Sequence, residues 1–220
     1  SDLIEVYEEM ETIGALQGRG AEYYQKLGYA LQKNKKYAEA IDAYLKADTL
    51  KPDNIWNNRH LAICYRLNRN YQAALSYYKK VEEATPEDTN VIFHIGSCLA
   101  ELGQYEEAAN YFFKLDFIES NCIKAWRGIG WCSFISRKYE QAMKYYEKII
   151  EQKPLAIDYM NAGHVAWTMG DIQKAAALYG KSITANGNRE RFLEMFRKDK
   201  EALLKQGIQE EDIPLMLDLL

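Results

Sequence analysis

Residues 36–52 read KYAEAIDAYLKADTLKP, and residues 138–154 read KYEQAMKYYEKIIEQKP. The two copies are three periods of 34 residues apart, and looser copies lie between them. A pattern that returns at a fixed period of this length is typical of repeat architectures, in which each repeat packs on its neighbours. The period therefore indicates the fold before any single residue does.

Four columns of small or aromatic residues keep this period through five repeats, predicted at 21–54, 55–88, 89–122, 123–155 and 156–189. The columns are Gly28, Ala62, Gly96, Gly130 and Gly163; Tyr37, Tyr71, Tyr105, Tyr139 and Ile172; Ala40, Ala74, Ala108, Ala142 and Ala175; and Tyr44, Tyr78, Phe112, Tyr146 and Tyr179. Within each repeat, apolar residues recur every three or four positions on both sides of a short polar break. This spacing predicts two helices, A and B, joined by a turn.

The glycine column is informative because glycine inside a helix costs about 1 kcal/mol relative to alanine. We expect the glycine of helix A to face the alanine of helix B, so that the two backbones approach closely. The aromatic residue four positions after that alanine is then expected to pack over the next repeat. Pro52, Pro86 and Pro154 end helix B in three repeats, because proline cannot continue a helix.

The chain resembles the tetratricopeptide repeat (TPR) family, whose pattern is W-x2-L-G-x2-Y, then A-x3-F, then P. The fourth repeat matches it with Trp126, Ile129, Gly130, Ala142, Tyr146 and Pro154. The resemblance covers about three quarters of the chain. It implies an all-α fold, a right-handed α-solenoid of about five helix-turn-helix repeats, and a role as a non-enzymatic scaffold for protein–protein interaction.

The two ends extend the array. Residues 1–20 place Val6, Met10 and Ile13 at the spacing of helix B, which predicts an N-terminal helix left from a preceding repeat. Residues 190–220 predict a capping helix followed by a short apolar tail helix. A cover of this kind keeps the open end of a solenoid soluble.

Composition narrows the function classes. A net charge of −4 offers no basic face for nucleic acid, and no run approaches the roughly 18 apolar residues of a membrane span. No signal peptide is visible at the N-terminus. Four cysteines without a disulfide framework favour a reducing, cytoplasmic location.

The cysteine and histidine side chains of helix A are better explained by packing than by catalysis or metal binding. Cys64, Cys98 and Cys132 share one small apolar slot of helix A, and His60 and His94 share another without a carboxylate beside them. No phosphate loop, zinc motif or nucleophile with a base is present. The sequence therefore predicts no enzyme activity, no metal site and no cofactor.

One stripe of helix A, its residues 2, 5, 9 and 12, is not needed for packing within the repeat. The resemblance implies that this inner stripe lines a concave groove. Its predicted partner-binding residues are Tyr29, Trp56, Arg59, Ile63, Arg66, Asn90, Phe93, Lys124, Arg127, Trp131, Phe134, Met160, His164 and Trp167. The full stripe carries four cations and one carboxylate, Glu22. Since aromatic residues and arginine dominate binding hot spots, we expect a protein or peptide partner with acidic and apolar groups.

Two further expectations concern the partner. The lysine, asparagine and arginine side chains with which TPR proteins clamp chaperone tails are replaced here by Gln25, Tyr29, His60, Asn90 and His94, which argues against Hsp70 or Hsp90 tails as ligands. The alternative to a partner-binding groove is a structural module. Its groove would be filled by its own C-terminal helix or by a second copy, giving a homo-oligomer or a spacer within a longer protein.

Overall fold

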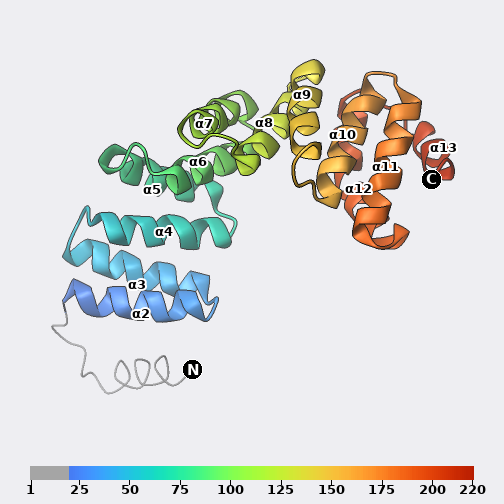
Figure 1. Cartoon of the computed structure of the whole chain (residues 1–220). Coiled ribbons are helices and arrows are strands. Elements are labelled where there is room, and N and C mark those ends of the chain that lie inside the picture. The colour runs from blue at the N-terminus through green and yellow to red at the C-terminus, as the bar shows by residue number, and fades with distance from the viewer. Residues whose placement is uncertain (1–19) are drawn as a thin grey trace. The chain divides into compact units, whose positions relative to one another are not determined.

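The computed structural model describes residues 20–220, and within that range the chain forms helices and no strand. The helices are α2 (Ala21–Lys33), α3 (Tyr37–Leu50), α4 (Ile55–Leu67), α5 (Tyr71–Ala84), α6 (Thr89–Glu101), α7 (Tyr105–Ile118), α8 (Ile123–Ile135), α9 (Tyr139–Ile150), α10 (Ala156–Thr168), α11 (Ile172–Asn186), α12 (Arg189–Lys205) and α13 (Asp212–Asp218) (Figure 1). The predicted all-α solenoid class is confirmed. The helix predicted within residues 1–20 lies outside the described residues.

The period of the sequence reappears in the helix starts. Helices α2, α4, α6, α8 and α10 begin at the residues where the period starts each repeat, and α3, α5, α7, α9 and α11 begin at the Tyr37 column. The chain divides into two compact halves, Ser1–Gly103 and Gln104–Leu220. In the N-terminal half each helix from α2 to α6 packs on the next one, and the same holds from α7 to α12 in the C-terminal half.

The glycines of helix A make room for an aromatic ring. A Cβ added to Gly28 would lie 2.8 Å from the ring of Tyr44, and one added to Gly130 would lie 2.9 Å from that of Tyr146. Both rings are fully buried. The prediction named only the alanine of helix B, whereas the nearest atoms belong to the ring four residues further along, which the missing Cβ admits.

The same ring also reaches the following repeat, as predicted. Tyr44 stacks on His60 with the ring centroids 5.6 Å apart, and Tyr78 stacks on His94 at 5.4 Å. One buried aromatic side chain thus joins both helices of its repeat to helix A of the next.

Several helices begin with a side-chain cap. The side-chain oxygens of Asn54, Asn70 and Asp171 accept hydrogen bonds from backbone N–H groups at the starts of α4, α5 and α11. A cap of this type contributes about 1 kcal/mol, because it satisfies an N–H group that has no partner within the helix. These polar residues therefore set where the helices begin.

Candidate functional site

The predicted inner stripe is open in the N-terminal half and partly closed in the C-terminal half. Tyr29 and Trp56 are 41% and 42% exposed. Phe134 and Trp167, each the twelfth residue of helix A in a later repeat, are 1% and 5% exposed, while Trp131, which shares the ninth position with Tyr29, is half-buried. The two halves therefore offer a partner different surfaces.

Three rings form a cluster on α2 and α4. The Trp56 ring lies 4.0 Å from the ring of His60 and 6.3 Å from that of Tyr29, measured between centroids. Below them, Oε1 of Gln32 accepts a hydrogen bond from the Tyr44 hydroxyl at 3.0 Å and lies 2.8 Å from Nδ1 of His60. Burial, with Arg59 and Lys33 nearby, lowers the pKa of His60 to about 4. His60 is therefore neutral at neutral pH, and its Nδ1 carries the proton because the Gln32 oxygen only accepts.

A concave pocket of about 710 Å³ opens beside this cluster. Its lining comprises Glu22, Gln25, Lys26, Tyr29, Ala30, Lys33, Asn34 and Trp56. The ammonium of Lys33 lies 5.1 Å above the Tyr29 ring, and Lys26 is paired with Glu22 at 3.1 Å. The pocket thus combines an aromatic wall with a cationic edge.

Arg59, which the sequence predicted to bind an acidic group of a partner, is already paired with a carboxylate of this chain. Its guanidinium lies 2.8 Å from Oδ2 of Asp88, and Oδ1 of the same carboxylate accepts the N–H groups of Asn90 and Val91 at the start of α6. Burial opposes ionisation of Asp88, yet the Val91 N–H and Arg59 together hold the pKa of its carboxyl below its usual value. Arg59 therefore ties α4 to α6 and is largely neutralised.

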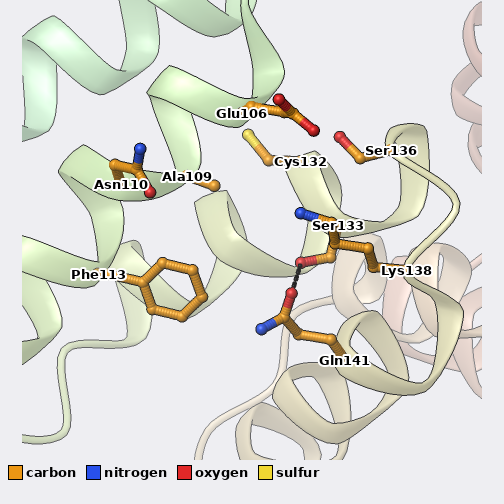
Figure 2. Close-up of a pocket in the computed structure, with 9 residues that line it drawn as sticks. All are labelled: Glu106, Ala109, Asn110, Phe113, Cys132, Ser133, Ser136, Lys138 and Gln141. Carbon is orange, nitrogen blue, oxygen red and sulfur yellow. Dashed lines mark hydrogen bonds between the residues drawn. The ribbon is translucent and has the colours of Figure 1, made fainter.

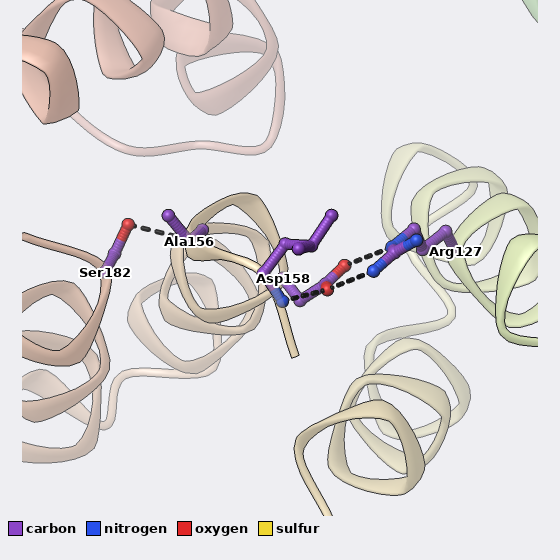
Figure 3. Close-up of polar contacts among 5 residues, drawn as sticks. Arg127, Ala156, Asp158 and Ser182 are labelled. Carbon is purple, nitrogen blue, oxygen red and sulfur yellow. Dashed lines mark hydrogen bonds and ion pairs between the residues drawn. The ribbon is translucent and has the colours of Figure 1, made fainter. Parts of the chain in front are cut away.

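Arg127 forms a two-pronged contact with the carboxylate of Asp158, which Figure 3 shows. Its Nε and Nη2 donate hydrogen bonds to the two carboxylate oxygens of Asp158, both at 2.7 Å. Asp158 is 1% exposed and also accepts the Leu155 N–H at 2.7 Å. The bonds to Asp158 raise the pKa of Arg127. The assignment of Arg127 to a partner's acidic group is therefore corrected: it joins α8 to α10.

Arg66 is half-buried and has no carboxylate partner among the described residues. Its Nε donates to the Tyr78 hydroxyl at 3.4 Å. Asn90 at the start of α6 is exposed, while Ile63 and Phe93 are half-buried. In the C-terminal half, Lys124 is paired with Glu119 at 3.3 Å, and Trp131 is half-buried 5.7 Å from Phe134.

Four predicted groove residues are corrected because they are buried. Phe134, Met160, His164 and Trp167 are at most 5% exposed. The Phe196 ring of α12 lies 5.4 Å from that of His164 and 6.4 Å from that of Trp167. Oδ2 of Asp199, also on α12, lies 3.4 Å from Nε2 of His164. The C-terminal helix thus covers part of the stripe that the sequence assigned to a partner.

A second pocket, of about 220 Å³, lies between α7, α8 and α9, and Figure 2 shows its lining. Among its lining residues, Ser133 donates a hydrogen bond from its hydroxyl to Oε1 of Gln141 at 3.1 Å. Burial raises the pKa of the Cys132 thiol there to about 12, so the thiol stays protonated at neutral pH. The pocket holds no nucleophile paired with a base.

Cys64 and Cys98 are packed in the core, as the sequence predicted. Cys64 and Cys98 are fully buried free thiols, and burial raises their pKa values to about 12 and about 11. Residues 20–220 contain no group of three His, Cys, Asp or Glu side chains that could hold a metal ion. In the same range, none of the helices has the length and apolar character needed to span a bilayer.

Comparisons with known proteins place these features in context. Tetratricopeptide repeat family models match residues 21–54, 66–132, 123–154 and 159–189. No curated protein sequence matches the chain.

Solved structures share the fold at low sequence identity. YrrB, described as a TPR protein with an unusual peptide-binding site, is 20% identical with a TM-score of 0.68, covering 84% of this chain and 97% of YrrB. MamA from Desulfovibrio magneticus RS-1, residue 41 to its end, is 16% identical with a TM-score of 0.71, covering 77% and 96%. A tetratricopeptide repeat protein from Parabacteroides merdae ATCC 43184 is 20% identical with a TM-score of 0.62, covering 98% and 89%.

Proposed function

The chain belongs to the tetratricopeptide repeat family, and from that premise we propose that its N-terminal half binds a segment of a partner protein against Tyr29 and Trp56. Such repeats form protein-interaction scaffolds rather than enzymes, and the chain is a scaffold of this kind. The partner segment carries an apolar or aromatic anchor for the pocket and an acidic group for Arg66 and Lys33.

The observation that carries this proposal is the exposed ring pair in a concave pocket. Tyr29 and Trp56 are each more than two-fifths exposed, whereas Trp167 of the C-terminal half is buried against Phe196 of α12. Exposed apolar surface rimmed by polar groups usually marks an interaction site. Lys33 at the edge of the pocket and Arg66 in the last turn of α4 have no carboxylate partner among the described residues, and they fit a partner with negative charge. The solved structure of YrrB, described as having a peptide-binding site, is consistent with a peptide ligand.

We expect Trp56→Ala to weaken a peptide ligand at least about tenfold, because a tryptophan anchor contributes about 1.4 kcal/mol or more at a binding hot spot. The ligand is obtained by selecting a displayed random peptide library on the wild-type protein. Its dissociation constant is then measured by fluorescence anisotropy for both proteins. Equal affinity for Trp56→Ala would contradict the proposal.

Leu50→Ala is the matched control for this experiment. Leu50 is 54% exposed on α3 and does not line the pocket, so its removal should leave the affinity unchanged. Self-association is followed separately by light scattering, because Leu215 of α13 and Leu219, which follows this helix, are each 63% exposed. A homo-oligomer remains a prediction of the sequence.

A further inference from the structure

The turn between helices A and B places one residue of each repeat in the left-handed backbone region. These residues and their φ angles are Lys35 (61°), Arg69 (60°), Gly103 (77°), Arg137 (60°) and Gly170 (85°). Glycine adopts this conformation freely, whereas an L-residue pays about 1 kcal/mol or more. Two repeats use glycine, so the other three keep a cation there at a cost in stability. Strain of this kind is often retained for a function.

Arg137 shows what such a cation does. Its Nη2 donates a hydrogen bond to the Lys205 carbonyl at 2.9 Å, in the last turn of α12. Two residues further on, the Tyr139 hydroxyl donates to Oε1 of Gln206 at 2.9 Å, and Nε2 of Gln206 donates to the Ile135 carbonyl at 3.3 Å. Gln206, the residue that caps α12, is 9% exposed.

This arrangement recognises the C-terminal end of a helix. The last carbonyl groups of a helix lack partners within it and carry about half a negative charge. Arg137 supplies a cation and a donor for one of them, while Tyr139 and the Ile135 carbonyl hold the amide side chain that caps the helix. The turn therefore supplies a cation for the negative end of the helix, a donor for one of its carbonyl groups, and a donor and an acceptor for an amide side chain.

The N-terminal half carries two copies of this turn without an occupant among the described residues. Lys35 and Tyr37, and likewise Arg69 and Tyr71, stand at the positions of Arg137 and Tyr139. Lys35 and Arg69 are exposed. Within residues 20–220 the four side chains make no hydrogen bond or ion pair. Arg66, in the last turn of α4, adds positive charge beside the second copy.

We propose that the Lys35–Tyr37 turn and the Arg69–Tyr71 turn are each a site for the C-terminal end of an α-helix of a partner protein. The residue that caps this partner helix is glutamine or asparagine. The cation donates a hydrogen bond to an exposed carbonyl of the partner helix. The tyrosine hydroxyl donates a hydrogen bond to the amide side chain of the residue that caps this helix. The four residues of the two turns do not line the aromatic pocket, so this contact is tested separately from the proposed peptide ligand. An anionic polymer would use the cations, but it would have no need of the tyrosine hydroxyls.

The probe for this site is a fluorescein-labelled peptide with the sequence of residues 192–209, amidated at its C-terminus. A hydrocarbon staple joins positions 194 and 198, which are exposed in α12, and keeps the peptide helical. Binding to the full chain is measured by fluorescence anisotropy. We expect the Lys35→Gly, Arg69→Gly double variant to bind at least about tenfold more weakly, because both charged donors are lost.

The same double variant should melt no lower than the wild type, since glycine relieves the left-handed strain at both turns. Lys51→Ala, which removes an exposed cation at a different turn of the same half, is the matched control and should bind normally. A peptide with leucine in place of Gln206 should bind weakly. The proposal is overturned if the wild type does not bind the probe, if the double variant binds it equally well, or if the leucine peptide or a DNA oligonucleotide competes as effectively.

Discussion

Replacing Arg127 by glutamate is expected to lower the free energy of unfolding of the C-terminal half by about 3 kcal/mol or more. Asp158 is 1% exposed and receives two of its three hydrogen bonds from Arg127. The substitution would leave this buried carboxylate facing a second negative charge. Removing one partner of a buried pair costs far more than the pair itself contributes, because the remaining charge is neither paired nor hydrated.

The measurement is thermal unfolding followed by circular dichroism, and we expect the melting temperature to fall by about 10 °C. Arg127→Lys should have a smaller effect, because lysine keeps the charge but cannot form the two-pronged contact with the carboxylate. Arg59→Glu is the second comparison. Its partner Asp88 has a side chain that is 24% exposed, so water compensates more of the loss. An unchanged melting temperature for Arg127→Glu would show that Arg127 does not join α8 to α10.

Gly130→Leu is expected to unfold the fourth repeat, with a cost of about 3 kcal/mol or more. Even a single Cβ at this position would lie 2.9 Å from Cζ of Tyr146, and the Tyr146 ring is fully buried. A leucine side chain needs still more room than that carbon. The higher helix propensity of leucine offsets only about 1 kcal/mol of the cost. Urea unfolding measures the difference from the wild type.

Gly180→Ala separates crowding from backbone flexibility. Gly180 lies inside α11, and an added Cβ there would meet nothing within 4 Å. We therefore expect this variant to be about 1 kcal/mol more stable than the wild type, because alanine is the better helix former. If Gly130→Leu proved as stable as Gly180→Ala, the close contact between α8 and α9 would be refuted.

The fold could be predicted from the sequence because its period is local and regular. Gly28, Tyr37, Ala40 and Tyr44 each have counterparts in every repeat, so one interpretation applied to the whole chain. The partner of the glycine could not be predicted, since both Ala40 and Tyr44 lie within reach of Gly28 along helix B. Only the packing shows that the ring of Tyr44 occupies the space.

The candidate site was predicted less completely, for two physical reasons. The carboxylates that neutralise Arg59 and Arg127 come from Asp88 and Asp158, which lie near the start of the following helix A and outside the stripe. A prediction made only from the residues of the stripe cannot include these carboxylates. An aspartate about 30 residues after each arginine was the signal that could have revealed both pairs.

The closed part of the stripe depends on the course of α12. The sequence predicted a capping helix, but its amphipathic pattern does not show how far the helix extends over earlier repeats. In the structure its Phe196 contacts α10, and its end at Gln206 reaches the turn between α8 and α9. Phe134 and Trp167 are buried there, while Trp56 in the other half stays exposed.

The central claim is that a partner segment binds beside Trp56 and not in the C-terminal half. Fluorine NMR of the protein labelled with 5-fluorotryptophan tests it directly, because the chain has four tryptophans and each resonance can be assigned by a Trp→Phe substitution. On addition of the selected peptide, we predict that the Trp56 resonance shifts while those of Trp126 and Trp167 stay in place. A shift confined to Trp131 or Trp167 would contradict this account.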